Sequence, residues 1–328
     1  MKVLVAPDKF KGTASAAAVA EAAARGASAA GAQARCLPMA DGGEGTLEAL
    51  GGPNRETVVT GPLGDPVTAA WRLQRSTAVV EMAAASGLAL VGGPDGNDPV
   101  AASTAGTGEL IVAAVEAGAR QIIVGVGGSA TTDGGFGALR AMYPLPRLRG
   151  TELIVACDVR TRFLDAAAAF GPQKGATPAQ VEFLRRRLER LAQVYADEYG
   201  IVVVDVDRSG AAGGLAGGLL AAGATLVDGF DLVADHLDLY EAIEAVDLVI
   251  TGEGFLDEES FHGKVVGGVH SYAQAAGVDV LAVVGQAFDG ASSRLPTLVL
   301  ADEFGLNEAL AHPEACIEQA VRRHLGAT

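Results

Sequence analysis

The stretch KVLVAPDKFKGTASAAAVAEAAARGASAAGAQARCLP, residues 2–38, decides the fold class. Val3 to Ala6 is a short apolar run bounded by a proline, which predicts a strand. The alanine-rich segment from Thr13 to Ala30 predicts a helix with Thr13 or Ser15 as its N-cap. Ala34 to Pro38 predicts a second strand. A strand, a helix and a strand in this order predict the start of a parallel α/β sheet.

The middle of the chain has a different pattern from its ends. Three runs separated by turns, at 57–60, 67–73 and 78–82, predict an antiparallel meander. Two further runs, at 121–126 and 153–158, also predict strands. From Asp247 the simple alternation of strands and helices resumes. We therefore predict two α/β domains. The first is a Rossmann- or flavodoxin-like parallel-sheet domain of residues 1–57 plus 240–328, and the second is a mixed α/β domain of residues 58–239 inserted into it.

Composition excludes several classes of protein. The net charge of −16 argues against general nucleic-acid binding, which uses basic surfaces. Arg185-Arg186-Arg187 lies mostly off the apolar stripe of a predicted helix, so we interpret it as a solvated face. No apolar run reaches the roughly 18 residues of a membrane-spanning helix, and the start of the chain lacks the apolar region of a secretion signal. The three cysteines are far apart, which fits a reducing cytoplasm.

The lysines are few and concentrated. Lys2, Lys9, Lys11, Lys174 and Lys264 are the only five among 24 cationic residues, and four of them lie in or beside glycine-dense segments. An acidic protein that binds an anionic substrate must concentrate its cations at the site. The distribution therefore indicates a site for anions.

Five glycine-dense segments follow predicted strands and carry charged residues. They are APDKFKGT (6–13), MADGGEGT (39–46), GVGGSATTDGGFG (125–137), FGPQKGA (170–176) and TGEGFLDEESFHGK (251–264). In α/β sheets the carboxyl ends of the strands form the ligand crevice, and glycine lets backbone N–H groups approach an anion. None of the segments has the spacing of a P-loop, and no GxGxxG follows the first strand. Each alone is typical of an ordinary turn, but together they supply the cations, N–H groups and carboxylates that phosphoryl transfer needs.

Several of these motifs, in their order along the chain, resemble the bacterial glycerate kinases of the glycerate 2-kinase type. The resemblance spans Val3 to about Gly285 and rests on APDKFKGT, DGGEGT, GVGGSATTDGG, CDV, FGPQKGA, GAAGGLAGG and DLVITGEGFLD with GK. It implies a cytoplasmic enzyme with two α/β domains that uses ATP and Mg²⁺ to phosphorylate D-glycerate in an interdomain cleft, typically giving 2-phosphoglycerate. The residues themselves leave the choice between the 2- and the 3-phosphate open. The chain departs from the family pattern at Thr132, Thr161-Arg162 and Glu259-Ser260.

Each site residue has a structural alternative. Lys9 and Lys11 are predicted to contact phosphate or the glycerate carboxylate, but could be solvent-exposed loop lysines. Glu44 could instead act as an acid at a helix N-terminus, and Asp133 could stabilise its own Asp-Gly turn.

The predicted site residues fall into three groups. The predicted catalytic residues are Asp133, Asp41, Lys9 and Asp257; the predicted binding residues are Asp8, Lys11, Gly42, Gly43, Glu44, Gly127, Gly128, Ser129 and Lys264; the predicted Mg²⁺ ligands are Asp257 and Glu253.

Other interpretations stay open at this point. The general base is one of Asp133, Asp41 and Asp257. The departures near Thr132 and Thr161 allow a kinase for another small hydroxy acid or sugar acid. A non-catalytic sensor of a nucleotide or sugar acid is a further alternative. The expected partners are glycerate and ATP, with no nucleic acid and no membrane; a homodimer is left open.

Overall fold

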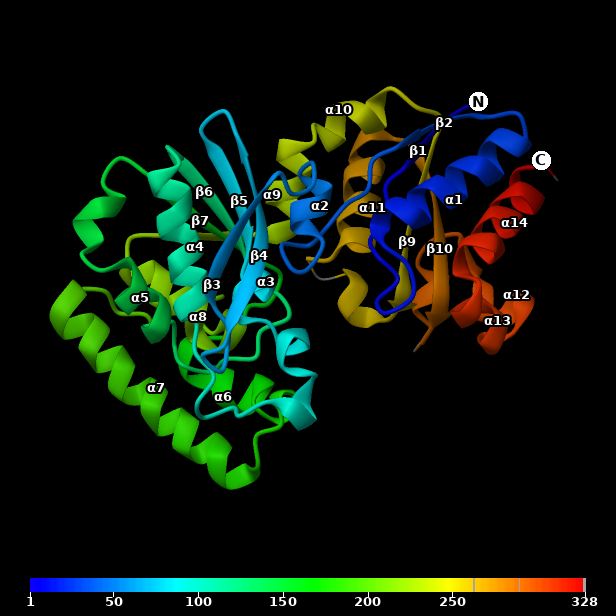
Figure 1. Ribbon diagram of the computed structural model, residues 1–328. Coiled ribbons are helices and arrows are strands. Elements are labelled where there is room, and N and C mark those ends of the chain that lie inside the picture. Colours follow the sequence, from blue (N-terminus) through cyan, green and yellow to red (C-terminus); the bar gives the residue numbers. More distant parts are fainter. Residues whose placement is uncertain (262, 289, 327–328) are drawn as a thin grey trace. The chain divides into compact units, whose positions relative to one another are not determined.

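The structure is a computed structural model and describes residues 1–261, 263–288 and 290–326 (Figure 1). The chain divides into two compact units. Unit 1 comprises Met1–Asp41 and Phe230–Thr328, and unit 2 comprises Gly42–Gly229. None of the helices in the described residues combines the length and hydrophobicity that crossing a bilayer requires.

Unit 1 is built around a parallel sheet. Within the described residues the sheet has five strands in the order β11-β10-β9-β1-β2, and every neighbouring pair is parallel. Its main elements are β1 (Lys2–Val5), α1 (Ala16–Ala29), β2 (Gln33–Cys36), α10 (Leu239–Glu244), β9 (Leu248–Leu256), α11 (Val265–Ala276), β10 (Asp279–Ala287), β11 (Thr297–Val299), α12 (Leu300–Phe304), α13 (Leu306–Ala311) and α14 (Pro313–Gly326), while α9 (Gly229–His236) begins at the boundary.

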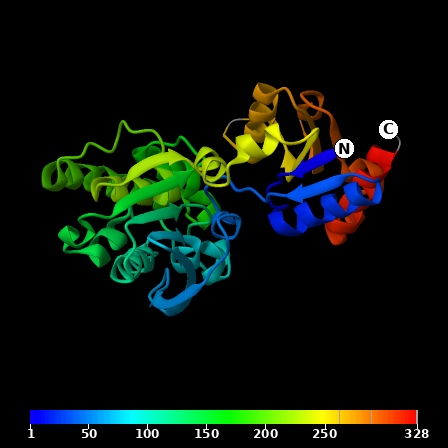
Figure 2. The ribbon, with the colours of Figure 1, turned by 90° about the horizontal axis from the view of Figure 1, so that it is seen from above.

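Helices cover both faces of this sheet (Figures 1 and 2). Val3 and Val5, two residues apart on β1, share a face and pack into one hydrophobic cluster with residues of α1 and α14. α11 packs on β9 from the other side. α1 begins where Ser15 accepts a hydrogen bond from the N–H of Ala18 (3.2 Å), so Ser15 is the N-cap of the two predicted candidates.

Unit 2 contains a mixed sheet of six described strands in the order β3-β4-β5-β6-β7-β8. The β3–β4 and β4–β5 pairs are antiparallel, as the predicted meander requires, and the other pairs are parallel. Its main elements are α2 (Thr46–Ala49), β3 (Arg55–Thr60), β4 (Pro66–Gln74), β5 (Thr77–Glu81), α3 (Ala83–Ser86), α4 (Ala105–Glu116), β6 (Gln121–Gly125), α5 (Phe136–Met142), β7 (Glu152–Cys157), α6 (Ala166–Phe170), α7 (Pro178–Tyr199), α8 (Ala211–Ala221) and β8 (Thr225–Asp228).

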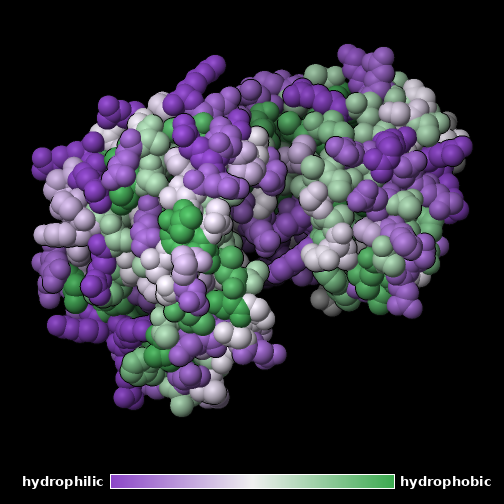
Figure 3. Space-filling model, in the orientation of Figure 1, coloured by the Kyte–Doolittle hydropathy of each residue, from purple (hydrophilic) through white to green (hydrophobic). Residues whose placement is uncertain are grey.

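A parallel sheet in one unit and a mixed sheet in the other confirm the predicted α/β fold class. Figure 3 shows hydrophilic residues interspersed with several hydrophobic areas, one of which lies over β3 and β4. Val58 on β3 is exposed. α7 begins with Thr177 as its N-cap, and Thr177 and Gln180 form a reciprocal capping box.

The boundaries of the compact units differ from the predicted domain boundaries at 57 and 240. Residues 42–57 belong to unit 2 because β3 pairs with β4 and because Glu81 on β5 accepts hydrogen bonds from the N–H groups of Gly45 (2.9 Å) and Leu47 (2.7 Å). Residues 230–239 belong to unit 1, where the ring of Phe230 packs edge-on against Tyr272 with centroids 5.7 Å apart. Local patterns of strands and turns do not reveal such side-chain contacts.

Candidate active site

The strand order of unit 1 reverses between β1 and β9. From β1 the chain continues to β2 on one side, whereas β9, β10 and β11 follow each other on the opposite side. Ligands of open α/β sheets bind beyond the carboxyl ends of the strands at such a reversal. Asp8 follows β1, Asp41 follows β2, and Glu253 lies in the last part of β9. These carboxylates therefore lie along one edge of the sheet.

Asp8 is fixed directly at the reversal. Its N–H donates to the carbonyl of Gly252 on β9 (2.8 Å), and its Oδ1 accepts from the N–H of Lys9 (2.7 Å). The Lys9 Nζ lies 3.6 Å from the same oxygen. Burial raises the pKa of Asp8 to about 6; the charge of Lys9 opposes this shift and the charge of Asp41 adds to it. Asp8, Lys9 and Asp41 therefore form one electrostatically coupled group.

Glu253 is the second buried carboxylate at this edge. It is 8% exposed, and its Oε1 is buried with no hydrogen-bond partner in the described structure. Burial is the main reason that its pKa rises to about 7; Ser260 and Lys264 lower it, whereas Asp8 and Asp257 raise it further. A buried polar atom without a partner is unusual in proteins. Glu253 is therefore suited to hold a cation or a ligand donor.

The segment after β9 contains two further predicted site residues of unit 1, Asp257 and Lys264. Oδ1 of Asp257 accepts from the N–H (3.0 Å) and hydroxyl (3.2 Å) of Ser260, so Asp257 caps the short turn at 258–261. Its Oδ2 has no hydrogen bond within the described residues. Lys264 is the half-buried residue before α11, and Lys11 is exposed. His262, which lies in the same predicted segment, falls outside the described residues.

Two predicted glycine loops pack together in unit 2. The N–H of Val126 donates to the carbonyl of Gly42 (3.1 Å). A Cβ on Gly42, which has φ +87°, would lie 2.9 Å from the carbonyl carbon of Ala156, and a Cβ on Gly127 would lie 2.7 Å from the Cα of Gly43. Only glycine permits this approach. The structure thus brings Gly42, Gly43 and Glu44 beside Gly127 and Gly128.

The sequence offers Glu44 as the acid at the α2 N-terminus, and the structure shows another acid bound there. Glu81 on β5 fills that role, because its Oε1 accepts from the N–H groups of Gly45 and Leu47. Glu81 lies at least 34 residues after the positions of the DGGEGT loop that it contacts. No motif near Glu81 in the sequence predicts this contact.

Asp133 is used for loop structure. Its carboxylate accepts hydrogen bonds from the N–H (2.9 Å) and hydroxyl (2.9 Å to Oδ2) of Thr104, from the N–H of Gly135 (3.0 Å) and from the N–H of Gly137 (3.1 Å). A carboxylate has about four lone-pair positions, so these bonds leave little capacity for a metal ion or a substrate hydroxyl. We therefore assign Asp133 to loop structure rather than to catalysis, as the Asp-Gly turn alternative anticipates in part.

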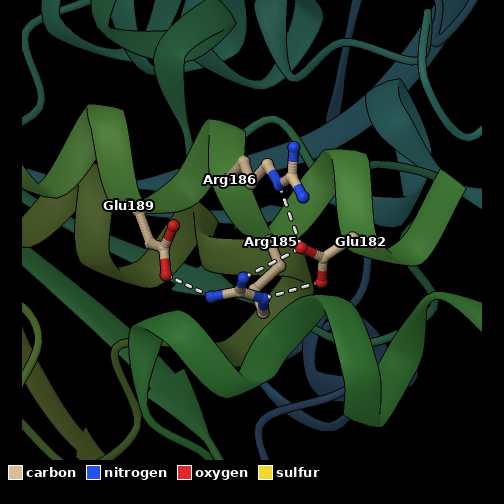
Figure 4. Close-up of polar contacts among 4 residues, drawn as sticks. All are labelled: Glu182, Arg185, Arg186 and Glu189. Atoms are coloured by element: carbon tan, nitrogen blue, oxygen red, sulfur yellow. Dashed lines mark hydrogen bonds and ion pairs between the residues drawn. The ribbon is translucent and has the colours of Figure 1, made fainter. Parts of the chain in front are cut away.

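Two cations in unit 2, the buried Lys174 and the half-buried Arg187, were not among the predicted site residues. Lys174 is 2% exposed and donates to the carbonyl of Thr131 (2.6 Å). Arg187 donates to the carbonyls of Val100 and Thr132, both at 2.8 Å. Its neighbours behave as predicted for a solvated face: Figure 4 shows Arg185 between Glu182 and Glu189, and Arg186 bound to Glu182. The scarcity of lysine pointed to Lys174, but nothing in the run of three arginines distinguished the inward member.

The carboxylates of unit 1 fit a metal ion that is held partly by the protein and partly by the substrate, rather than one whose ligands all come from the protein. Among the residues that the structure describes, no three His, Cys, Asp or Glu side chains are arranged to hold a metal ion. Mg²⁺ is usually held by one or two carboxylates together with water and substrate phosphates. The open Oε1 of Glu253 and Oδ2 of Asp257 are compatible with such a site.

Comparison with known proteins gives a consistent result. The chain matches the glycerate kinase family over residues 3–143 and 144–326. It is 41% identical to a glycerate kinase of Bacillus subtilis (strain 168), over 87% of this chain and 85% of the relative. It is 40% identical to a glycerate 2-kinase of Escherichia coli (strain K12), over 88% of this chain and 86% of the relative. The crystal structure of a candidate glycerate kinase 2 from Salmonella typhimurium LT2 superposes with a TM-score of 0.83 at 35% identity, covering 100% of this chain and 98% of that one.

Proposed function

The chain belongs to the glycerate kinase family, and on this premise we propose that it transfers the γ-phosphoryl group of ATP to D-glycerate, giving 2-phosphoglycerate. The main supporting observation is the group of Asp8, Lys9, Glu253 and Lys264 at the strand reversal of unit 1. Cations and buried carboxylates in one place are what a polyphosphate with its metal ion requires. The glycerate kinase names of the relatives support glycerate as the acceptor.

Glu253 and Asp257 are the proposed ligands of Mg²⁺, which would neutralise charge on the transferred phosphoryl group. Glu253 contributes a desolvated oxygen, Oε1, to which no described residue donates a hydrogen bond, and Asp257 is held in place by Ser260. Lys9 and Lys264 add positive charge at the same edge. These lysines stabilise the phosphoryl oxygens through charge-assisted hydrogen bonds.

In the proposed reaction the glycerate hydroxyl oxygen attacks the γ-phosphorus in line. An oxygen–phosphorus bond forms, the bond to the bridging oxygen of ADP breaks, and the hydroxyl proton passes to a carboxylate. We assign that proton to Asp8, with Asp41 beside it, because a base works best when its pKa lies near the operating pH and Asp8 has its pKa raised to about 6. The backbone N–H groups of Gly127, Gly128 and Ser129 are the proposed contacts of unit 2 to substrate oxygens.

An assay that couples ADP formation to NADH oxidation, with D-glycerate as acceptor, tests this proposal. NMR of the product then gives the position of the new phosphate, and EDTA tests the metal requirement. Asp8→Asn should lower kcat by about 10²- to 10⁴-fold, whereas Asp302→Asn, an exposed control in unit 1, should not.

Three outcomes would contradict parts of the proposal. Turnover with another hydroxy acid but not with D-glycerate would replace the substrate. Absence of turnover with every acceptor at high enzyme concentration would favour a sensor. Normal turnover by Asp8→Asn would remove Asp8 from the mechanism.

A further inference from the structure

The loop after β6 is held by its carbonyl groups. Four of the five carbonyls from residue 130 to residue 134 accept a hydrogen bond from a side chain located elsewhere in unit 2. The bonds are Asn97 Nδ2 to Ala130 (3.0 Å), Lys174 Nζ to Thr131 (2.6 Å), Arg187 Nη2 to Thr132 (2.8 Å) and Tyr195 Oη to Gly134 (2.8 Å). We call these four side chains the carbonyl clamp.

Most N–H groups of the same loop, unlike its carbonyls, form no hydrogen bond within the described residues. Within the described residues, the N–H groups of 127, 128, 129, 131, 132 and 133 donate no hydrogen bond. Ala130 and Gly134 are the exceptions, bonding Ser86 and Gly213. Backbone N–H groups in folded proteins are almost always bonded, to protein, water or ligand. Gly127 is half-buried and Gly128 is exposed, so solvent and solutes can reach the first N–H groups of the run.

The threonine side chains give a second, independent sign of an acceptor. The hydroxyls of Thr131 and Thr132 are buried, with both residues 0% exposed, and neither has a hydrogen-bond partner in the described structure. Unpartnered buried hydroxyls and unpartnered N–H groups therefore occur in one loop. Both kinds of group can donate to oxygen atoms of an anion or of bound water.

The clamp itself is costly to maintain. Lys174 is 2% exposed, and among the described residues its ammonium donates to the carbonyl of Thr131 and lies 5.9 Å from the centre of the Phe170 ring. Burial lowers the pKa of Lys174 to about 7, and the charge of Asp133 opposes this only in part. A buried cation is unfavourable unless its bonds compensate for desolvation. Two cationic side chains on the consecutive carbonyls of Thr131 and Thr132 fix the orientation of the loop.

We propose that residues 127–133 bind an oxyanion of the substrates through their N–H groups, and that Lys174 and Arg187 are positioning residues that fix the carbonyls of the loop. The oxyanion is either a phosphoryl group of the nucleotide or the carboxylate of the hydroxy acid. Because carbonyls repel anions, holding them in the clamp keeps the donor groups available for the ligand. This inference rests on the proposed function for the identity of the ligand.

Steady-state kinetics of Lys174→Met and Arg187→Met test the positioning role. Each should raise one KM by about 10- to 100-fold, because a small displacement of a binding loop has effects of this size. A raised KM for ATP assigns the loop to phosphoryl oxygens, and a raised KM for D-glycerate assigns it to the carboxylate. Arg187→Lys keeps a cationic donor, so its KM should lie between the values of the wild type and of Arg187→Met. A purely structural role of Arg187 would not require this partial recovery of KM.

Arg186→Met is the matched control, since Arg186 lies on the same helix but is exposed and bound only to Glu182 (Figure 4). Its kinetic constants should stay at wild-type values. Folded Lys174→Met and Arg187→Met enzymes with unchanged KM for both substrates would overturn the proposal.

A measurement on the wild-type protein tests the oxyanion site even if the variants fail to fold. Inorganic phosphate should shift the amide resonances of Gly127, Gly128 and Ser129 in a saturable way, and resonances that do not move up to high phosphate concentration would overturn the oxyanion site. Saturable shifts in a protein that shows no phosphoryl transfer would support the oxyanion site while refuting the proposed function.

Discussion

Replacing Glu253 with glutamine should stabilise the protein at alkaline pH while removing a proposed metal ligand. Glu253 is 8% exposed, and burial raises its pKa from the ordinary 4.5 to about 7. Because the folded-state pKa is higher, the folded protein holds a proton between about pH 4.5 and 7 that the unfolded chain has lost. The free energy of unfolding therefore falls as pH rises through this window.

The size of the effect follows from the same shift. At about 1.4 kcal/mol per pKa unit, the rise from 4.5 to about 7 corresponds to about 3 kcal/mol at pH 8. Glutamine does not titrate, so Glu253→Gln should exceed the wild-type free energy of unfolding by up to about 3 kcal/mol at pH 8 and match it near pH 4. The exposed Glu259 of the same segment provides the control Glu259→Gln, which should behave as wild type at both pH values.

Denaturant unfolding in EDTA, followed by circular dichroism, measures this difference. Trp71 is the single tryptophan and is buried in unit 2, so its fluorescence reports that unit alone and should be unaffected. Added Mg²⁺ should then stabilise the wild type but not Glu253→Gln, because a ligand stabilises only the state that binds it. A difference between variant and wild type that is equal at pH 4 and pH 8 would refute the reasoning.

Three further predictions concern unit 2. Asp133→Ala should lower the free energy of unfolding by at least about 3 kcal/mol, since buried donors lose their acceptor; an unchanged Trp71 fluorescence transition would contradict its structural assignment. Ala212 has φ 52°, in the left-handed region that strains a residue with a side chain, so Ala212→Gly should raise the free energy of unfolding by about 1 kcal/mol in the same assay. A decrease would show that the backbone at Ala212 is not strained. Glu81→Ala releases the N–H groups of Gly45 and Leu47, so KM for ATP or D-glycerate should rise about tenfold; unchanged constants would separate this loop from the site.

Local patterns predicted much of the fold because strands and helices are specified by short-range periodicity. The apolar run at Val3, the caps at Ser15 and Thr177 and the meander before residue 82 all follow from residues close in sequence. The glycine loops were also predictable, since only glycine allows the close approach that Gly42 and Gly127 make.

The roles within the site depended on contacts between distant residues. Asp133 has the same local sequence whether it binds a metal ion or Thr104, and only the position of Thr104 distinguishes the two. Arg187 and Arg186 are adjacent and chemically identical, yet one reaches a buried carbonyl and the other an exposed carboxylate.

The sequence by itself determined the α/β class, the position of the glycine loops and the motifs that identify the family. The tertiary structure decided which charged groups are buried together. β1 and β9 pair with Val3 opposite Leu248, and this pairing places Asp8 beside Glu253. Burial and proximity raise the pKa of both carboxylates, and neither property is encoded in the residues next to them, because both depend on which distant segments exclude water.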